Sequence, residues 1–287
     1  MTKSKGKTIQ IFLPDGNPRG IKIADITSRT VQTLSIPRSS LDEVAKRSEI
    51  KSVGIYFLIG TTNEGAKPML YIGEAENCLV RLKQHNQKKE FWNIALVAIS
   101  KTQFFTKSHI KYLEWYCYES AKKADRYILD NSQIPSKPYI PEPVEADLMD
   151  NFDTIKILVS TLGYPLFDTI AKPKQKKDIL ICKGKDAVAQ GEYTEDGVVV
   201  FAGSTANIQE SKSVQAWISD KRQKLIEQGV LKLKDNVYIF TSNYIFPSPS
   251  AASAVVLGRS ANGWIEWRYQ DGKTLDEVKR QNGEDDH

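Results

Sequence analysis

Apolar and polar residues alternate over the first hundred positions in short runs that are typical of β-strands. Such runs occupy residues 8–13, 21–26 and 31–36, and more continuous apolar runs occupy 53–59, 69–72 and 94–99. Capping residues and helical spacing of apolar side chains predict helices at about 40–48, 77–85 and 107–123. From residue 53 the order is β-β-α-β-α, which predicts an α/β (α+β) fold.

The pattern changes after Asn131, where prolines at positions 135, 138, 141 and 143 fall close together. This stretch is predicted to be a linker or an extended wrapping segment. A helix at about 145–162 and a lysine-rich stretch at 172–177 follow. The remaining residues predict a second small α+β domain, with strands at 179–182, 197–202 and 237–240, a helix at 213–227 and another beginning at Ser248-Pro249. We therefore expect an N-terminal β extension (1–48), a core domain (49–132), a proline-rich linker with a helix (133–175) and a C-terminal domain (176–287).

Composition and charge narrow the classes of protein. The chain of 287 residues is 40% hydrophobic and 26% charged, which is typical of a soluble globular protein. No apolar run approaches the roughly 18 residues that cross a bilayer, and the basic N-terminus lacks the apolar segment of a signal peptide, so we expect a cytoplasmic protein without membrane association. Residues 1–131 hold 21 Lys and Arg against 13 Asp and Glu. This basic half suits a binder of phosphate backbones, although a merely soluble basic surface is an equal alternative.

Cysteine and histidine are too sparse for several kinds of site. The three cysteines, Cys78, Cys117 and Cys182, stand singly, and only three histidines occur, His85, His109 and His287. Neither a disulfide framework nor a zinc site is predicted, so any metal would be held by oxygen. No phosphate-binding glycine motif is present, which leaves nucleotide-cofactor chemistry without support.

Two tyrosines and a basic helix face form the first candidate site. Tyr56 and Tyr71 lie on consecutive predicted strands, and they share a sheet face only if the paired residue numbers add up to an odd value. For either tyrosine alone, a packed strand residue is the favoured interpretation. Arg81 and His85 are four residues apart and therefore neighbours on one helix face. Arginine suits phosphate oxygens, but a solvated helix charge is the more common role.

Glu114 is the most informative acid of the chain. The apolar stripe of its helix contains Ile110, Leu113 and Cys117, and Glu114 lies at the border of that stripe. A carboxylate placed there is costly unless it is paired or holds a cation, so a structural salt bridge and a metal site are equal alternatives. Because no second acid is placed in this way, one metal ion is more plausible than two. Glu74 and Glu76 are expected only to complement a helix dipole.

Gly54-Ile55-Tyr56, then Tyr71-Ile72-Gly73, Arg81, His85, Glu114 within Tyr112-Leu113-Glu114, and Asn131 follow one another in an order that resembles the GIY-YIG nuclease family. The resemblance covers about residues 50–132. It implies a GIY-YIG nuclease core over 49–132, with a small antiparallel β-sheet flanked by helices. It also implies a metal-dependent DNA endonuclease, a phosphodiester hydrolase whose partner is DNA and whose cofactor is Mg²⁺ (or Mn²⁺) at Glu114.

The same resemblance assigns a role to each matching residue. Tyr56 would activate or position water, and Arg81 would neutralise charge on the scissile phosphate. Tyr71 and His85 would orient the attack, and Asn131 would support the end of the active site. A tyrosine with an ordinary pKa near 10 is a poor base at neutral pH, so we expect Arg81 or a metal-bound water network to lower the pKa of Tyr56.

The second half resembles, through residues 246–252 and 258–267, an uncharacterised accessory domain of the kind fused to such nucleases. This resemblance implies a role in DNA targeting, in which Trp264 and Trp267 stack on bases and Arg259 and Arg268 contact phosphates. The favoured alternative for the two tryptophans is a place in a small core. The alternative function for the whole chain is a non-cleaving DNA-binding or damage-sensing protein that retains the nuclease fold. A protein-interaction scaffold is a third possibility, and the sequence leaves the oligomeric state open.

Overall fold

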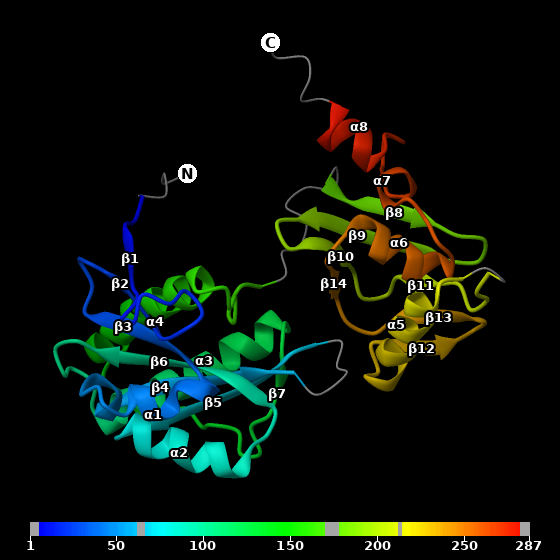
Figure 1. Cartoon of the computed structure of the whole chain (residues 1–287). Helices are drawn as coiled ribbons and strands as arrows, with labels where there is room; N and C mark the ends of the chain where they lie inside the picture. The colour runs from blue at the N-terminus through cyan, green and yellow to red at the C-terminus, as the bar shows by residue number, and fades with distance from the viewer. Residues whose placement is uncertain (1–5, 62–66, 170–177, 212–213, 282–287) are drawn as a thin grey trace. The chain divides into compact units, whose positions relative to one another are not determined.

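The computed structural model describes residues 6–61, 67–169, 178–211 and 214–281. These residues form two compact units, one made of the described residues up to Thr169 and one of those from Asp178 onward (Figure 1). Each unit has a hydrophobic core of its own, so the two are described separately. In the described part of the chain, no helix is long and apolar enough to cross a membrane.

The first unit is built on a seven-stranded sheet with the spatial order β1-β2-β3-β6-β4-β5-β7. Its strands are β1 (Ile9–Phe12), β2 (Lys22–Ile26), β3 (Val31–Pro37), β4 (Gly54–Gly60), β5 (Met69–Ala75), β6 (Trp92–Ser100) and β7 (Ile128–Leu129). The expectation of a small antiparallel sheet is wrong in two respects. The predicted N-terminal extension joins the same sheet, because β3 pairs with β6 from Val31↔Ser100 to Pro37↔Ile94. The sheet is also mixed, because β5 and β7 are parallel.

Helices cover both faces of this sheet. They are α1 (Leu41–Val44), α2 (Cys78–Lys88), α3 (Lys107–Ala124) and α4 (Glu142–Thr161), with short 3-10 turns at Arg38–Ser40 and Glu49–Lys51. One core contains side chains of α1 and α2, and the other contains side chains of α3 and α4. Strand β4 is buried along its whole length and sends Tyr56 and Leu58 to the first core, and Ile55 and Phe57 to the second. Its continuous apolar run is therefore that of a central strand covered on both sides.

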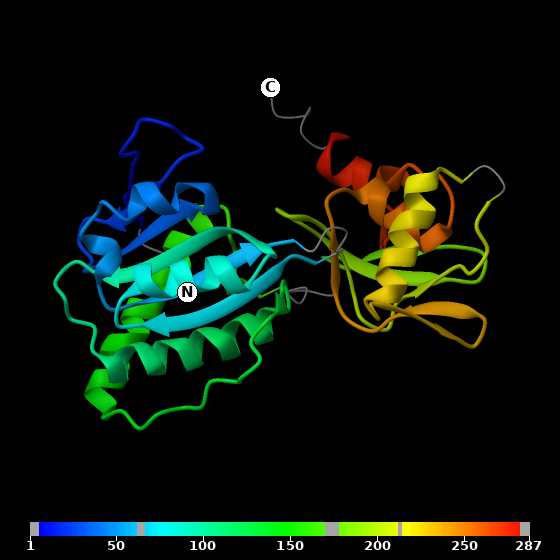
Figure 2. The same cartoon turned by 60° about the horizontal axis from the view of Figure 1, so that its bottom comes forward.

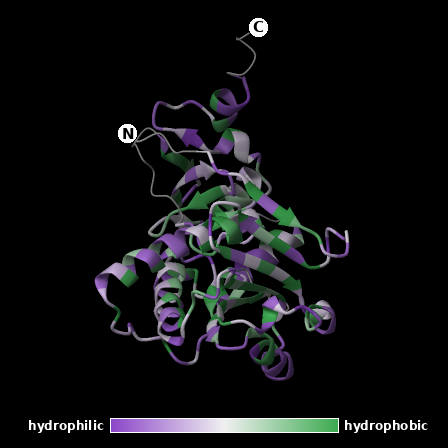
Figure 3. Ribbon diagram, turned by 90° about the vertical axis from the view of Figure 1, so that its left-hand side faces the viewer, coloured by the Kyte–Doolittle hydropathy of each residue, from purple (hydrophilic) through white to green (hydrophobic). Residues whose placement is uncertain are grey.

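Capping residues stabilise the starts of α2 and α3, as the sequence predicts. Asn77 caps α2 by accepting a hydrogen bond from the backbone N–H of Val80. Helix α3 begins with a capping box between Thr106 and His109. Helix α4 begins three residues before the predicted start, because Pro143 fits the first turn of a helix instead of preventing it. Figure 3 shows apolar residues concentrated on the strands of the sheet.

The second unit contains two small antiparallel sheets, as Figure 2 also shows. The five-stranded sheet holds β8 (Leu180–Lys183), β9 (Val188–Thr194), β10 (Gly197–Val200), β14 (Tyr244–Phe246) and β15 (Arg268–Tyr269). The three-stranded sheet holds β11 (Thr205–Ala206), β12 (Leu231–Lys234) and β13 (Val237–Phe240). Its helices are α5 (Ala216–Glu227), α6 (Pro249–Leu257), α7 (Gly263–Glu266) and α8 (Leu275–Lys279). The predicted cap at Ser248 is confirmed, because its side chain accepts a hydrogen bond from the N–H of Ala251 at 3.1 Å.

Candidate functional site

Tyr56 and Tyr71 lie on one face of the sheet. The pairing of β4 with β5 sets Tyr56 opposite Gly73, two residues from Tyr71, which is the odd register that the sequence left open. The two rings stack with their centroids 6.1 Å apart. A Cβ on Gly73 would lie 2.3 Å from the hydroxyl oxygen of Tyr56, so only glycine leaves room for this ring. The ring of Tyr56 therefore explains sterically why the tripeptide Tyr71-Ile72-Gly73 ends in glycine.

The hydroxyl of Tyr56 meets two side chains of α2. The Nε of Arg81 donates a hydrogen bond to it at 3.3 Å, and the Nε2 of His85 lies 2.9 Å from it. A guanidinium has no acceptor, so the oxygen of Tyr56 must be the acceptor in the contact with Arg81. The predicted pairing of Arg81 and His85 on one helix face is confirmed, and both contact the same atom.

The electrostatics of this group differ from expectation. Tyr56 is completely buried, and burial raises its pKa well above 10, while the contact with Arg81 lowers that pKa only in part. Arg81 alone therefore does not bring the pKa of Tyr56 below its ordinary value, and the other expected cause, a metal-bound water network, stays a prediction. His85 is 6% exposed, and burial together with the nearby charge of Arg81 lowers its pKa to about 4. The imidazole is consequently neutral at physiological pH and free of charge repulsion with Arg81.

Glu114 lies on α3, across the cleft from these residues. Burial, followed by the charge of Glu74, raises the pKa of Glu114 to about 7, and Lys107 and Lys111 oppose this shift. Within the described ranges Glu114 forms no ion pair, which removes the structural salt bridge that was the alternative to a metal site. Glu74 instead pairs with Lys107 of α3, at 2.8 Å from each carboxylate oxygen. The expected dipole role of Glu74 is therefore replaced by an ion pair beside Glu114.

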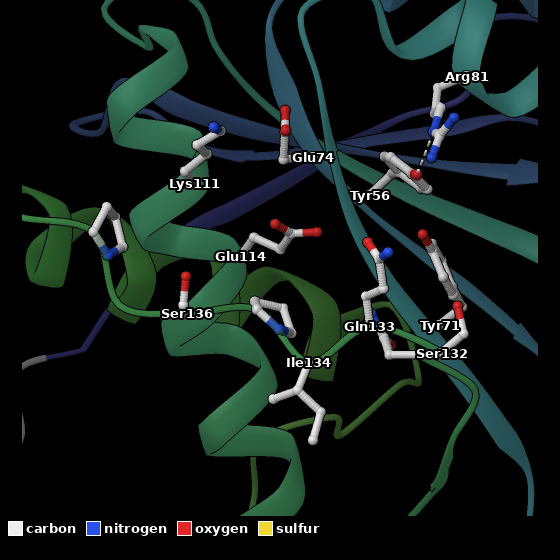
Figure 4. A pocket seen from close by; sticks show the side chains of 13 residues that line it. Tyr56, Tyr71, Glu74, Arg81, Lys111, Glu114, Ser132, Gln133, Ile134 and Ser136 are labelled. Atoms are coloured by element: carbon white, nitrogen blue, oxygen red, sulfur yellow. Dashed lines mark hydrogen bonds between the residues drawn. The ribbon is translucent and has the colours of Figure 1, made fainter.

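These side chains meet in a cleft of about 560 Å³ (Figure 4). The cleft is lined by Tyr56, Tyr71, Glu74, Arg81, Lys111, Glu114, Asn131, Ser132, Gln133, Ile134, Pro135, Ser136 and Pro138. Five of the six residues singled out in the sequence line it. The sixth, His85, does not, and contacts the cleft through the hydroxyl of Tyr56 and through the ring of Tyr71, whose centroid lies 4.8 Å from the centroid of the imidazole. In Figure 4 the carboxylate of Glu114 points into the space between α3 and the two tyrosines.

Asn131 holds the open edge of β5. Its Nδ2 donates a hydrogen bond to the carbonyl oxygen of Ile72 at 2.7 Å, and the N–H of Ile72 donates to its Oδ1 at 3.1 Å. Strand β7 ends at Leu129, so the side chain of Asn131 takes the place of a further backbone partner for β5. This arrangement fixes the edge on which Tyr71 and Glu74 stand.

Sequence reasoning missed two parts of the cleft. Lys111 lines it and lies three residues before Glu114, so the helical spacing was a usable signal. The segment of residues 132–139, which we call the strap, was predicted as a linker or wrapping segment. It continues from Asn131 without helix or strand, with bends at Ser132 and Gln133, and supplies six of the lining residues. Its proline content predicted the lack of a regular element but not the surface that it covers.

The residues present fit a single divalent ion. Among the described residues there is no cluster of three or more His, Cys, Asp or Glu that would enclose a metal. Mg²⁺, however, is commonly bound by one or two carboxylates and completed by water and substrate phosphate. Glu114 offers such a carboxylate, because it lines the cleft and has no salt bridge within the described residues. Burial raises the pKa of this side chain and so favours its neutral, protonated form.

The predicted base-stacking tryptophans of the second unit are not available. Trp267 is completely buried, and its Nε1 donates a hydrogen bond to the carbonyl oxygen of Pro249 at 3.1 Å, so the prediction that it stacks on bases is wrong. The guanidinium of Arg280 lies 3.5 Å from the ring centroid of Trp264, and Tyr193 packs against the same ring edge to face. The alternative interpretation as core residues therefore fits both tryptophans better.

Comparison with known proteins identifies only the second unit. Residues 180–279 match a domain of unknown function, DUF4357, which confirms an uncharacterised domain in the C-terminal part. No nuclease family matches the N-terminal region. No curated protein matches the chain, and no solved structure does.

Proposed function

We propose that this protein is a metal-dependent DNA endonuclease that hydrolyses phosphodiester bonds at the cleft of its first unit. The proposal rests on the convergence of Arg81, Tyr56, Tyr71 and Glu114 on one cleft, although they come from four different elements. The order of these residues in the sequence, which resembles the GIY-YIG nucleases, supports the same activity. Phosphoryl transfer depends mainly on positioning and on cations around the phosphate, and the cleft supplies both.

Each residue has a role that follows from its contacts. Arg81 and Lys111 stand on opposite walls of the cleft and would hold the phosphate between them. Glu114 would hold Mg²⁺ or Mn²⁺, and such an ion, when bound, supplies charge neutralisation at the leaving oxygen. Tyr71, which lines the cleft and stacks on Tyr56, would orient the attacking water.

Tyr56 need not become a free phenolate in this scheme. Its oxygen accepts from Arg81, and in the His85 tautomer that carries its proton on Nδ1 the hydroxyl of Tyr56 donates to the Nε2 of His85. We infer that Tyr56 accepts the proton of the attacking water while it passes its own proton to His85. This exchange avoids a free phenolate at Tyr56 and places the proton on His85, where burial and Arg81 disfavour it, and it gives His85 a role although it does not line the cleft.

Cleavage of plasmid and branched DNA in the presence of Mg²⁺ tests the proposal. Glu114→Ala is expected to abolish cleavage, and Tyr56→Phe to reduce kcat by about 10²–10⁴ because the proton relay is lost. The matched control is Glu119→Ala, since Glu119 is an exposed acid on the same helix. DNA binding without cleavage would instead support the non-cleaving alternative, which the burial of Tyr56 favours. Equal cleavage by wild type and Glu114→Ala would refute the proposed metal site.

A further inference from the structure

The strap combines firm anchors with unusually exposed apolar side chains. Within it Tyr139 is 91% exposed and Ile134 is 66% exposed; Ile134 lines the cleft, and Tyr139 follows the lining residue Pro138 in the sequence. In the part of the chain that the structure describes, Tyr139 makes no hydrogen bond and no ring contact. Tyrosine is enriched at interfaces because its ring offers a large apolar surface that ends in a polar group.

The strap is held at both ends, so its exposed residues are not on a loose loop. Asn131 fixes its beginning to β5, and Ile140, just after its end, is buried in the core of the first unit. Lys137 pairs with Glu145 at 3.1 Å and lies 5.1 Å from the ring centroid of Trp115. Pro135 and Pro138 restrict the backbone between these anchors. A ligand that contacts the strap therefore loses little binding free energy to the ordering of this segment.

The size and depth of the cleft restrict the kind of DNA that reaches its floor. Pockets of about 300–1,000 Å³ hold a single small molecule, and this cleft, at about 560 Å³, has room for a group of about that size. Tyr56 is completely buried, Glu114 is half-buried, and the strap walls one side of the cleft. A nucleotide that has left the base stack reaches such a site at a lower cost than one inside a duplex, and the cost is least where the base is already unpaired.

Two lysines, one that lines the cleft and one on the strap, provide positive charge for the phosphates of a nucleic-acid strand. Lys111 lines the cleft, and Lys137 on the strap remains partly exposed although it pairs with Glu145. A cation close to an exposed aromatic ring is a combination that binds single strands, since phosphates contact the cation and bases stack on the ring.

We propose that the strap, through Tyr139 and Ile134, is a stacking wall for an unpaired base beside the scissile phosphate, so that the substrate class is DNA with unpaired nucleotides at the cut. This inference rests on the proposed function, because it requires a DNA strand in the cleft. The inference goes beyond the proposed function because it assigns a role in binding to two residues of the strap. It also predicts a preference for single-stranded tails over continuous duplex.

Binding of fluorescent oligonucleotides to the full chain in EDTA tests the inference without cleavage. The probes are a single strand, a duplex and a duplex with an unpaired tail, at one fixed salt concentration. Wild type is expected to bind the tailed DNA at least tenfold more tightly than the duplex. Tyr139→Ala is expected to weaken binding of the single strand and of the tailed DNA about tenfold, which corresponds to about 1.4 kcal/mol, and to leave duplex binding within twofold. Ile134→Ala is expected to act in the same direction.

Two controls make the result specific. Tyr139→Trp retains a stacking ring and is expected to restore the preference. Phe12→Ala removes an aromatic residue that is 59% exposed on β1, at the other end of the strand order from β5 and β7, and is expected to change nothing. Equal binding of all three DNAs by wild type, or a loss on Tyr139→Ala that is the same for duplex and single strand, overturns the inference alone. Absence of binding to any DNA overturns the proposed function together with it.

Discussion

At the scale of single residues, Glu114 is held in a state that costs stability. Its pKa of about 7 exceeds the value of about 4.3 expected in an unfolded chain. Between these values the folded protein keeps a proton that the unfolded chain has lost, so the free energy of unfolding falls as the pH rises. The residue that carries this cost lines the cleft, and groups with strongly shifted pKa values cluster at functional sites.

Glu114→Gln is therefore expected to be more stable than wild type at pH 8, by about 1–3 kcal/mol, and equal to it near pH 4. The amide keeps the shape of the side chain and removes the charge that burial disfavours. Urea unfolding at both pH values measures the difference. Glu119→Gln, on the exposed side of α3, is expected to show no such pH dependence. A variant at position 114 that is as stable as wild type at pH 8, or less so, would contradict the shift.

The candidate residues could be predicted one by one, but their electrostatics could not. The spacing of Arg81 and His85 on a helix gave their common face, and the order of motifs gave Glu114 and Asn131. The spacing suggested Arg81 as a cause of a lowered pKa at Tyr56, but burial outweighs Arg81, because burial depends on how α2 and β5 cover the ring. Sequence spacing carries no information about that covering.

At the scale of elements, Asn131 fixes the edge of β5, the strand that carries Tyr71 and Glu74 into the cleft. The side chain of Asn131 pairs with both backbone groups of Ile72, beyond the point where β7 ends. Asn131→Ala is expected to leave these groups without a partner and to cost about 1–3 kcal/mol of stability. Hydrogen exchange of the Ile72 amide should accelerate, whereas Ser132→Ala, in the next residue, should leave it unchanged. Unaltered exchange in Asn131→Ala would show that β5 does not depend on this contact.

The elements themselves were predictable to different degrees. Long periodic segments such as α3 and the apolar strand β6 were placed within two residues of their observed ends. Strands β9 and β12 were missed, because β9, although seven residues long, is rich in polar residues, and β12 alternates leucine with lysine over only four positions. Their pairing partners stabilise them, and a single segment does not reveal its partners.

At the scale of the whole molecule, the first unit joins three regions that the sequence predicted as separate segments. The predicted N-terminal extension supplies β1, β2 and β3 to the sheet that carries the cleft, and the predicted linker supplies the strap and α4. A hydrophobic pattern predicts that a segment is a strand, but the order of strands in a sheet depends on long-range pairing. All the lining residues of the cleft nevertheless belong to the first unit.

This containment leads to the last prediction. A chain that ends after residue 169 keeps all the strands of the mixed sheet and both cores of the first unit, so it is expected to fold and to retain Mg²⁺-dependent cleavage. Its affinity for DNA is expected to fall several-fold, if the DUF4357 unit contributes contacts to the backbone, and the dependence of binding on salt should weaken in parallel. Binding measured at several salt concentrations for the two chains separates these effects. An unchanged affinity and salt slope would dispose of the DNA-targeting role and leave the cleft as the site that binds DNA.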